Sequence, residues 1–336
     1  MVFLFQAQKF LYPLRYSLRK AFRVCLSRYS MNCVLTLIAN PSIESLSPSI
    51  EKECLDFLSQ NKCGFTSSQV LDSDIAMDYF FTSDAAGSLG DLRLQISDFF
   101  THAPFDVAIQ PISHRRKKML ISDMDSTVIG QECIDELADE CGLKNQVSAI
   151  TERAMRGELE FESALIERIS LLKGLPETCL NKVFEEKITV NPGAELLVRT
   201  MAAHGAHCLL VSGGFNFFTE RIATRLGFHS QHANTLLTDN GLLTGKVGLP
   251  ILGKEAKLTA LNTYASQLHI LTEDVVALGD GANDLPMIEA AGLGIAYYAK
   301  PQVAIKAHVS LRYTDLRSVL YIQGYSKSHF FGGVFL

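Results

Sequence analysis

Apolar residues occur along the chain in short runs typical of strands and at the spacing typical of helices. The order in which these two patterns follow one another differs between regions of the chain and predicts different folds for them. Between about residues 32 and 112, the runs CVLTLIA, SSQVLDSD, IAMDYFFTS and FDVAIQPI are predicted as strands from their β-branched and apolar content. The segments SIEKECLDFLSQN and LGDLRLQISDFFTHA carry apolar residues at helical spacing, which predicts amphipathic helices. The order is β-α-β-β-α-β, so residues 32–112 are expected to form an α+β domain of the ferredoxin-like type.

After a basic segment, SHRRKK, that we expect to be a solvated linker, short apolar strands alternate with helical segments. This alternation predicts an α/β domain with a mainly parallel sheet. KMLIS leads into Asp123 and Asp125, HCLLV leads into Ser212, and VVALG leads into Asp280 with Asp284 close behind. Open α/β sheets bind ligands at the carboxyl ends of their strands, so these side chains are expected to meet at one edge.

The stretch between the first two of these strands has a pattern of its own. From ECIDELADECGL to PETCLNKVFEEK it shows helical periodicity and no strand signal, so we expect a helical cap over residues 130–189. The predicted catalytic core then consists of residues 113–129 and 190–328.

The N-terminus is basic and contains no acidic residue as far as Ile43. Such a segment resembles an organellar transit peptide. The alternative is that the true start is Met31 rather than Met1. In either case residues 1–31 are expected to be a poorly structured extension.

Composition narrows the classes of function. A net charge of −5 argues against a nucleic-acid partner, since domains that bind nucleic acid are usually basic. Apolar runs are too short to cross a bilayer, so no membrane partner is expected. The eight cysteines are scattered without a CxxC pair, which favours reduced thiols and a cytoplasmic location.

The polar strand ends suggest phosphate chemistry. Two carboxylates at Asp123 and Asp125 would repel each other unless a cation or a shared proton compensates them, and Mg²⁺ is a hard ion that takes oxygen ligands. The hydroxyl and glycine amides of the SGG segment are suited to binding phosphate. The segment ILGKEAKLTALNTY adds a lysine that would neutralise phosphate charge. Its spacing allows Lys254 or Lys257, and the helical register favours Lys257.

The motifs DMDST, SGG, the helix lysine and GDGAND, taken in this order, resemble the haloacid dehalogenase-like phosphatases. Within them, residues from about 117 to 325 look like the phosphoserine phosphatase family, including GLGIAYYAKP. The N-terminal domain looks like an ACT-type regulatory domain. The resemblance implies a three-layer Rossmann-like core with a helical cap, together with an ACT-like domain.

The same resemblance implies a reaction, which is the Mg²⁺-dependent hydrolysis of O-phospho-L-serine to L-serine and phosphate, the last step of L-serine biosynthesis. Asp123 would be the nucleophile and form an aspartyl-phosphate. Asp125 would protonate the leaving oxygen and later deprotonate water. The implied metal site consists of the Asp123 carboxylate, the Asp125 backbone carbonyl and the Asp280 carboxylate, with Asp284 orienting metal-bound water.

Substrate contacts are implied as well. The phosphoryl group would be bound by Ser212, Gly213, Lys257 and Asn283. In the cap, Glu132 matches the family's ammonium-binding glutamate and Arg168 matches the arginine that binds the carboxylate, for which a planar guanidinium is well suited. Phe161 and Met155 match the apolar residues that close over the substrate.

Several alternatives remain at this point. The enzyme could act on another small phosphomonoester, or pass the phosphoryl group to an alcohol instead of water. A non-catalytic regulatory protein would require a damaged catalytic set, and none of the expected residues is missing. The N-terminal domain could bind an effector, form a homodimer or serve as a structural appendage.

Overall fold

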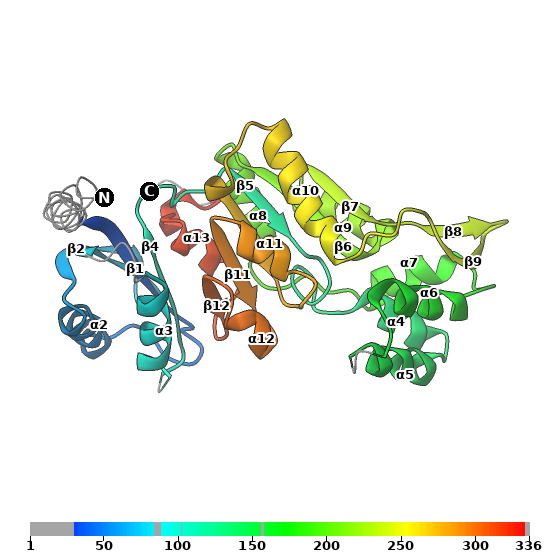
Figure 1. The fold of residues 1–336 in the computed structure, drawn as a ribbon, viewed down its shortest axis with the longest axis horizontal. Coiled ribbons are helices and arrows are strands. Elements are labelled where there is room, and N and C mark those ends of the chain that lie inside the picture. The colour runs from blue at the N-terminus through cyan, green and yellow to red at the C-terminus, as the bar shows by residue number, and fades with distance from the viewer. Residues whose placement is uncertain (1–29, 84–88, 102, 156–157, 333–336) are drawn as a thin grey trace, which may run out of the picture.

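The computed structural model describes residues 30–83, 89–101, 103–155 and 158–332, which are coloured in Figure 1. Of the predicted N-terminal extension, residues 1–29 lie outside this description. Three parts follow one another along the long axis of the molecule, namely the N-terminal domain, the central sheet and the helical cap (Figure 1).

The N-terminal domain has the predicted β-α-β-β-α-β order. Its elements are β1 (Met31–Ala39), α2 (Pro48–Gln60), β2 (Gly64–Asp72), β3 (Ala76–Ser83), α3 (Leu89–Phe99) and β4 (Phe105–Pro111). In the described part of the chain, the strands form an antiparallel sheet in the order β2-β3-β1-β4. This arrangement is compatible with an ACT-like domain, which stays a prediction.

Both faces of this sheet are covered, which explains why β1 is apolar along its length. Leu35 and Leu37 belong to the core that the sheet forms with α2 and α3. Ile38 belongs instead to the large core of the following domain. Strand β2 begins at Gly64, three residues before its predicted start. The apolar pattern did not indicate these first residues because they are exposed and show no apolar alternation.

The central domain is built on a parallel sheet, as predicted. Its strands are β5 (Met119–Ser122), β6 (His207–Phe215), β7 (Ser230–Asn234), β10 (Val275–Gly279), β11 (Leu293–Tyr297) and β12 (Val309–Leu311). Over the described residues they pair in the order β12-β11-β10-β5-β6-β7, and each pair is parallel. Strands β5 and β10 are central and completely buried, which is typical of a parallel sheet that is covered on both faces.

Helices cover the two faces of this sheet and complete three layers. They are α8 (Ala194–Ala203), α9 (Asn216–Leu226), α10 (Lys254–Gln267), α11 (Leu285–Ala290), α12 (Pro301–Ala304) and α13 (Ser318–Ile322), with short 3₁₀ turns η1 (Thr272–Asp274) and η2 (Lys327–His329). Leu120 and Leu278 pack in the core that includes residues of α8, α9 and α13. Ile121 and Ala277 point to the other face and pack in the core that includes residues of α10 and α11. The three-layer α/β prediction is therefore confirmed.

The cap is inserted between β5 and β6. It consists of α4 (Cys133–Glu140), α5 (Lys144–Met155), α6 (Phe161–Leu171) and α7 (Thr178–Glu186). The hairpin of β8 (Leu236–Asp239) and β9 (Leu242–Val247) reaches the cap from the central domain. Leu243 exchanges backbone hydrogen bonds of 2.8 Å with the loop between α6 and α7, at Gly174 and Leu175.

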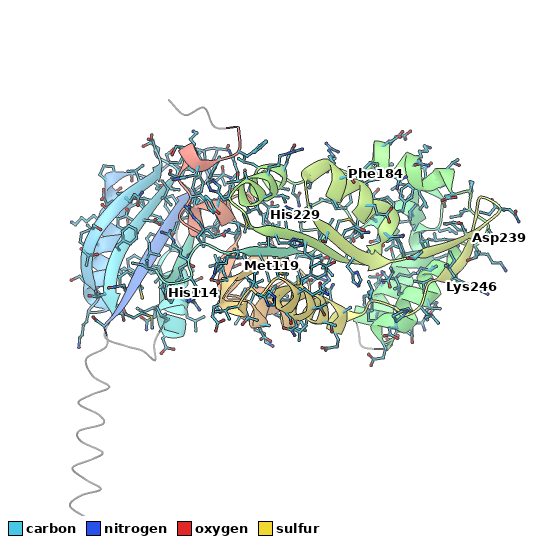
Figure 2. All side chains as sticks on the ribbon, turned by 90° about the horizontal axis from the view of Figure 1, so that it is seen from above. His114, Met119, Phe184, His229, Asp239 and Lys246 are labelled. Atoms are coloured by element: carbon cyan, nitrogen blue, oxygen red, sulfur yellow. The ribbon has the colours of Figure 1, made fainter. Side chains whose placement is uncertain are left out.

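Seen from above, the hairpin residues Asp239 and Lys246 lie at the cap end of the molecule, and His114 lies toward the N-terminal domain (Figure 2). No helix among the described residues is long and apolar enough to span a membrane.

Candidate active site

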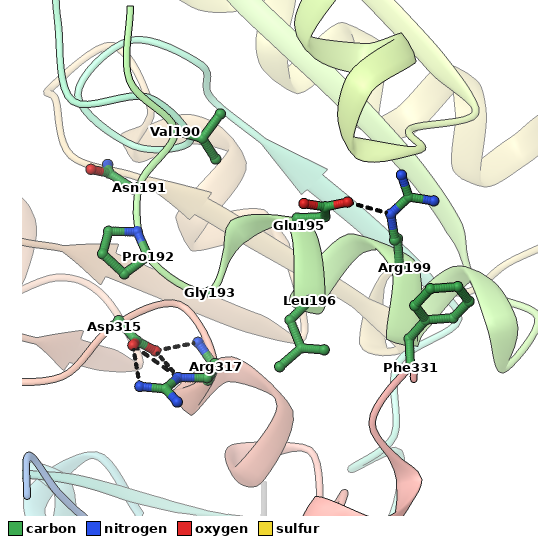
Figure 3. A pocket seen from close by; sticks show the side chains of 10 residues that line it. All are labelled: Val190, Asn191, Pro192, Gly193, Glu195, Leu196, Arg199, Asp315, Arg317 and Phe331. Carbon is green, nitrogen blue, oxygen red and sulfur yellow. Dashed lines mark hydrogen bonds and ion pairs between the residues drawn. The ribbon is translucent and has the colours of Figure 1, made fainter. Parts of the chain in front are cut away.

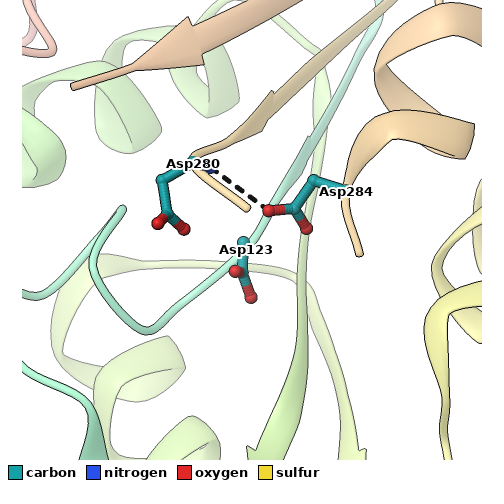
Figure 4. A group of neighbouring side chains, drawn as sticks. All are labelled: Asp123, Asp280 and Asp284. Carbon is teal, nitrogen blue, oxygen red and sulfur yellow. Dashed lines mark hydrogen bonds between the residues drawn. The ribbon is translucent and has the colours of Figure 1, made fainter. Parts of the chain in front are cut away.

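Three carboxylates converge at the carboxyl edge of the central sheet. Asp123 directly follows β5, Asp280 directly follows β10, and Asp284 is four residues further on. Each offers an oxygen, and these oxygens lie within 4.8 Å of one another (Figure 4). Asp123 and Asp284 are buried, at 5% and 0% exposure. The structure thus brings together the carboxylates that the sequence predicted as metal ligands.

Lys257 lies among these acids. Its ammonium nitrogen is 2.8 Å from Asp123 Oδ1 and 2.5 Å from Asp284 Oδ1. Burial opposes the charge of Lys257, but the two carboxylates outweigh this effect and raise its pKa. Of the two lysines that the sequence left open, Lys257 is therefore located at the strand ends. The side chain of Lys254 lies outside the described part of the structure.

Asp284 also orders the loop around it. Its Oδ2 accepts hydrogen bonds from the backbone N–H groups of Asp280, at 3.2 Å, and Gly281, at 3.0 Å. A β-carbon at position 279 would collide with the Asp284 side chain, so only glycine fits there. With its other oxygen bound to Lys257, Asp284 has both oxygens engaged within the protein. The geometry is that of a residue that orients the site.

The charge balance of the cluster fits a bound cation. Burial and then Asp284 raise the pKa of Asp123 well above its ordinary value, and Lys257 only partly opposes them. Burial and Asp284 likewise raise the pKa of Asp280 to about 6. One ammonium therefore faces three carboxylates. A donor set made of oxygen atoms with uncompensated negative charge is suited to a hard divalent ion.

Asp125 connects the cluster with two other segments. Its Oδ1 accepts a hydrogen bond from the backbone N–H of Cys133 at 2.9 Å, and its Oδ2 accepts one from the Ser212 hydroxyl at 2.9 Å. The Ser212 oxygen in turn accepts the N–H of Gly214 at 2.8 Å. A β-carbon at Gly214 would lie 2.8 Å from Asp125 Oδ2. Asp125, the predicted acid–base residue, is therefore in direct contact with the predicted phosphate-binding segment. We call this segment, Ser212, Gly213 and Gly214, the phosphate loop, and it lies in the last part of β6.

The cap reaches the same loop through Phe161, the first residue of α6. A β-carbon at Gly213 would lie 3.2 Å from the Phe161 ring, and one at Gly253 would lie 3.8 Å from it. Asn234 connects the phosphate loop to the segment before α10. Its side-chain amide donates to the carbonyl of Gly213 at 2.9 Å, and its Oδ1 accepts a hydrogen bond from the N–H of Leu252 at 2.7 Å. Phe161 thus lies against the phosphate loop, and its role in closing over the substrate stays a prediction.

Glu132 and Arg168 supply opposite charges from the cap. Glu132 accepts a hydrogen bond from the Ser126 hydroxyl at 2.8 Å. Desolvation of the carboxylate, and then the negative charge of Asp125, raise the pKa of Glu132 to about 7. The hydrogen bond from the Ser126 hydroxyl acts in the opposite direction and lowers this pKa. Arg168 is half-buried on α6. Burial lowers the pKa of Arg168, and the nearby carboxylates of Asp135 and Glu132 raise it.

The remaining predicted residues can be placed only in part. Asn283 lies in the loop before α11, where its Oδ1 occupies the space that a β-carbon at Gly281 would need. Met155 is the last residue of α5, and its side chain lies outside the described part of the structure.

Sequence reasoning missed two contributors to the site. The backbone N–H of Cys133 has no signature in the sequence, because backbone donors belong to every residue type except proline. Asn234 gave only a weak signal, as a polar residue at the end of a short strand. At 2% exposure its amide is satisfied by the phosphate loop and the segment before α10.

Comparison with known proteins agrees with this geometry. Residues 120–289, just over half of the chain, match the haloacid dehalogenase-like hydrolase family. The chain is 40% identical over 243 residues to phosphoserine phosphatase SerB2 of Mycobacterium tuberculosis, which covers 72% of this chain and 59% of that protein. The chain therefore spans less than two thirds of that relative.

Solved structures similar to this chain also include a phosphoserine phosphatase and a HAD family hydrolase. A phospho-aspartyl intermediate analogue of phosphoserine phosphatase is 41% identical, with a TM-score of 0.57 and coverage of 61% of this chain and 98% of that chain. A HAD family hydrolase from Salmonella enterica serovar Typhi is 30% identical, with a TM-score of 0.78 and coverage of 87% and 98%. The predicted resemblance of the catalytic part is confirmed, and the chain belongs to the haloacid dehalogenase-like hydrolase family.

Proposed function

We propose that this chain is a Mg²⁺-dependent phosphoserine phosphatase that hydrolyses O-phospho-L-serine to L-serine and phosphate, the last step of L-serine biosynthesis. The observation that carries the proposal is the position of Lys257 between Asp123 and Asp284, beside Asp280. Phosphoryl transfer depends chiefly on positioning and on neutralising charge, and this arrangement provides both. The names of the similar proteins support the same activity.

We assign Asp123 as the nucleophile. Hydrogen bonds from the Met124 N–H and the Lys257 ammonium, each 2.8 Å, orient its carboxylate. A bond forms between its oxygen and phosphorus while the bond between phosphorus and the serine oxygen breaks. The resulting aspartyl-phosphate divides the reaction into two easier steps.

We assign Asp125 as the general acid and base. It gives a proton to the leaving serine oxygen in the first step and takes one from the attacking water in the second. Its contacts with Cys133 and Ser212 hold the carboxylate beside the phosphate loop. A carboxylate that is fixed in this way can act in both steps without moving.

The metal site would consist of the Asp123 carboxylate, the Asp125 backbone carbonyl and the Asp280 carboxylate, with Asp284 orienting a metal-bound water. When bound, Mg²⁺ supplies positive charge that stabilises the oxygens of the transferring phosphoryl group. The donor set consists only of oxygen atoms, as Mg²⁺ prefers.

The two ends of the substrate are assigned to different parts of the protein. Ser212, the Gly213 amide, Lys257 and Asn283 bind the phosphoryl group. From the cap, Glu132 binds the ammonium group and Arg168 binds the carboxylate. Phe161 and Met155 close over the substrate and exclude water.

The test is phosphate release from L-phosphoserine, compared with p-nitrophenyl phosphate and several sugar phosphates, with and without EDTA. We expect a strong preference for L-phosphoserine that EDTA abolishes and Mg²⁺ restores. The nucleophile is tested with the variant Asp123→Asn. This variant should unfold cooperatively on heating, which shows that it is folded, but it should show no turnover. Activity on the generic ester alone would exclude the substrate, and substantial activity of Asp123→Asn would exclude the nucleophile. Adding a small alcohol and analysing its phosphate ester identifies the acceptor.

A further inference from the structure

The N-terminal domain is attached to the central domain through an extensive polar and apolar interface. Ile38 and Ala108 of its sheet pack in the large core of the central domain. The Arg115 guanidinium donates to both carboxylate oxygens of Asp78 at 2.7 Å and also to the carbonyl of Ile322 at 2.9 Å. These contacts fix the face of the sheet opposite α2 and α3.

One residue of this interface, Asp106 of β4, orders a turn of the central domain. It is 3% exposed, and it accepts hydrogen bonds from three successive backbone N–H groups, those of Arg312 at 2.9 Å, Tyr313 at 3.2 Å and Thr314 at 2.9 Å. It also accepts the Thr314 hydroxyl at 2.6 Å. Successive N–H groups that converge on one carboxylate fix the conformation of the turn that carries them.

The same turn continues to the linker through which the chain returns from the cap. The N–H of Leu316 donates to the carbonyl of Pro192 at 3.2 Å. A β-carbon at Gly193 would lie 2.5 Å from the Arg317 nitrogen and 2.9 Å from Asp315 Oδ1. Figure 3 shows Pro192 and Gly193 above Asp315 and Arg317. The linker therefore rests directly on the turn that Asp106 orders.

The linker also borders a recess of about 480 Å³, which is lined by Glu195, Arg199 and Phe331 and, from the turn, by Asp315 and Arg317 (Figure 3). The turn therefore contacts the linker at Pro192 and Gly193 and also forms one wall of this recess. The turn of residues 312–317 is thus a packing partner of the linker where it leaves the cap.

The return linker is paired with the outgoing one, which leads from the catalytic acids into the cap. The N–H of Asn191 donates to the carbonyl of Val128 at 2.9 Å, and its side-chain amide donates to the carbonyl of Thr127 at 2.8 Å. The N–H of Gly130 donates to the carbonyl of Thr189 at 3.0 Å. The two linkers are thus hydrogen-bonded to each other at the base of the cap, and we call this pair of linkers the hinge. In the sequence, the outgoing linker follows Asp125 and precedes Glu132.

We propose that Asp106 is a positioning residue for the phosphatase reaction, because the turn of residues 312–317 that it orders supports the hinge of the cap. The N-terminal domain thereby sets where Glu132 and Arg168 lie relative to Asp123. This inference rests on the proposed function for its substrate readout. It also predicts a change in the hinge itself that can be measured without turnover.

The test variant is Asp106→Asn, which replaces a carboxylate that accepts four hydrogen bonds with an amide that has one acceptor oxygen. We expect KM for L-phosphoserine to rise about threefold to tenfold, as is typical of coupling between distant sites, with little change on p-nitrophenyl phosphate, which lacks the ammonium and carboxylate groups. Hydrogen exchange in residues 127–131 and 189–193 should become faster in the absence of substrate. Gly193→Ala disturbs the same contact from the linker side and should have the same two effects.

The matched control is Tyr321→Phe. It removes a hydrogen bond of 2.6 Å to Asp72 across the same domain interface, and this bond is not one of those that Asp106 makes with residues 312–314. If Asp106→Asn behaves like this control in both KM and hinge exchange, the inference is wrong. If Asp106→Asn does not fold, Thr314→Val replaces it, since that variant removes the hydroxyl bond to Asp106 and the bond from the Ser318 hydroxyl but keeps the three backbone bonds, and the same criteria apply. If wild type shows no preference for L-phosphoserine, the proposed function fails, and hinge exchange alone decides the inference.

Discussion

The backbone N–H of Cys133 donates a hydrogen bond of 2.9 Å to the carboxylate of Asp125, and this bond joins the carboxyl edge of the sheet to the first helix of the cap. Cys133 is the first residue of α4 and directly follows Glu132, which we assign to the substrate ammonium. The residue proposed to move protons and the residue proposed to recognise the substrate are therefore attached to the same helix end. A shift of α4 would disturb both together.

The first prediction concerns Asp125→Asn. The amide keeps an acceptor for the Cys133 N–H but cannot exchange a proton, so turnover of L-phosphoserine should fall by about 10²–10⁴-fold. With p-nitrophenyl phosphate the leaving group needs no proton, and only the second step should be slow. Rapid-mixing measurements should then show a burst of p-nitrophenol close to one per enzyme, followed by slow turnover.

The matched control for that experiment is Asp135→Asn, which changes a carboxylate on α4, the helix that begins at Cys133, and leaves the bond between Asp125 and Ser212 in place. It should show no burst, because its second step stays fast. Equal losses on both substrates without a burst would show that Asp125 does not act as the proton donor and acceptor.

The second prediction concerns Arg168→Ala. If the guanidinium binds the substrate carboxylate, KM for L-phosphoserine should rise about tenfold or more, since a charge-assisted bidentate contact is among the stronger hydrogen bonds. KM for p-nitrophenyl phosphate should hardly change. Arg153→Ala is the control, because Arg153 pairs with Glu167 at 2.8 Å on the neighbouring helix. Similar effects of the two variants would mean that Arg168 only stabilises the cap.

The third prediction concerns Lys257→Met. The substitution leaves Asp123 and Asp284 buried without their ammonium partner, so metal-free protein should lose about 3 kcal/mol of unfolding free energy, and activity should be lost. Urea denaturation and phosphate release measure the two effects. Lys254→Met, at the first residue of the same helix, should leave both nearly unchanged. The opposite result would assign the phosphate contact to Lys254.

Much of the site could be predicted because its signals are local. Asp123, Ser212 and Asp280 each follow a short apolar run in the sequence, and a parallel sheet places the carboxyl ends of its strands at one edge. In the structure Ser212 lies within β6, which continues to Phe215. The helical register that favoured Lys257 was also local information. The structure places the Lys257 ammonium 2.8 Å from Asp123 Oδ1.

The contacts between domains could not be predicted in this way. Asp106 and Thr314 are 208 residues apart, and nothing in either segment indicates the other. The contact of Leu243 with Gly174 and Leu175 likewise depends on where a hairpin and a helical loop lie in space. Periodicity identifies elements and buried faces, whereas the pairing of distant polar groups depends on the orientation of whole domains.

The last prediction concerns acid stability and His308. Its Nδ1 accepts the N–H of Gly294 at 2.8 Å, and burial, followed by the charges of Arg93 and Lys117, lowers its pKa from 6.5 to about 4. Between these two values the unfolded chain binds a proton that the folded chain excludes, so stability should fall as pH decreases through this window and the contribution should level off below it. His308→Gln keeps an acceptor but does not titrate. Urea denaturation from about pH 7 to about pH 4 should show a shallower fall in unfolding free energy for the variant, and parallel curves would show that His308 protonates equally in both states.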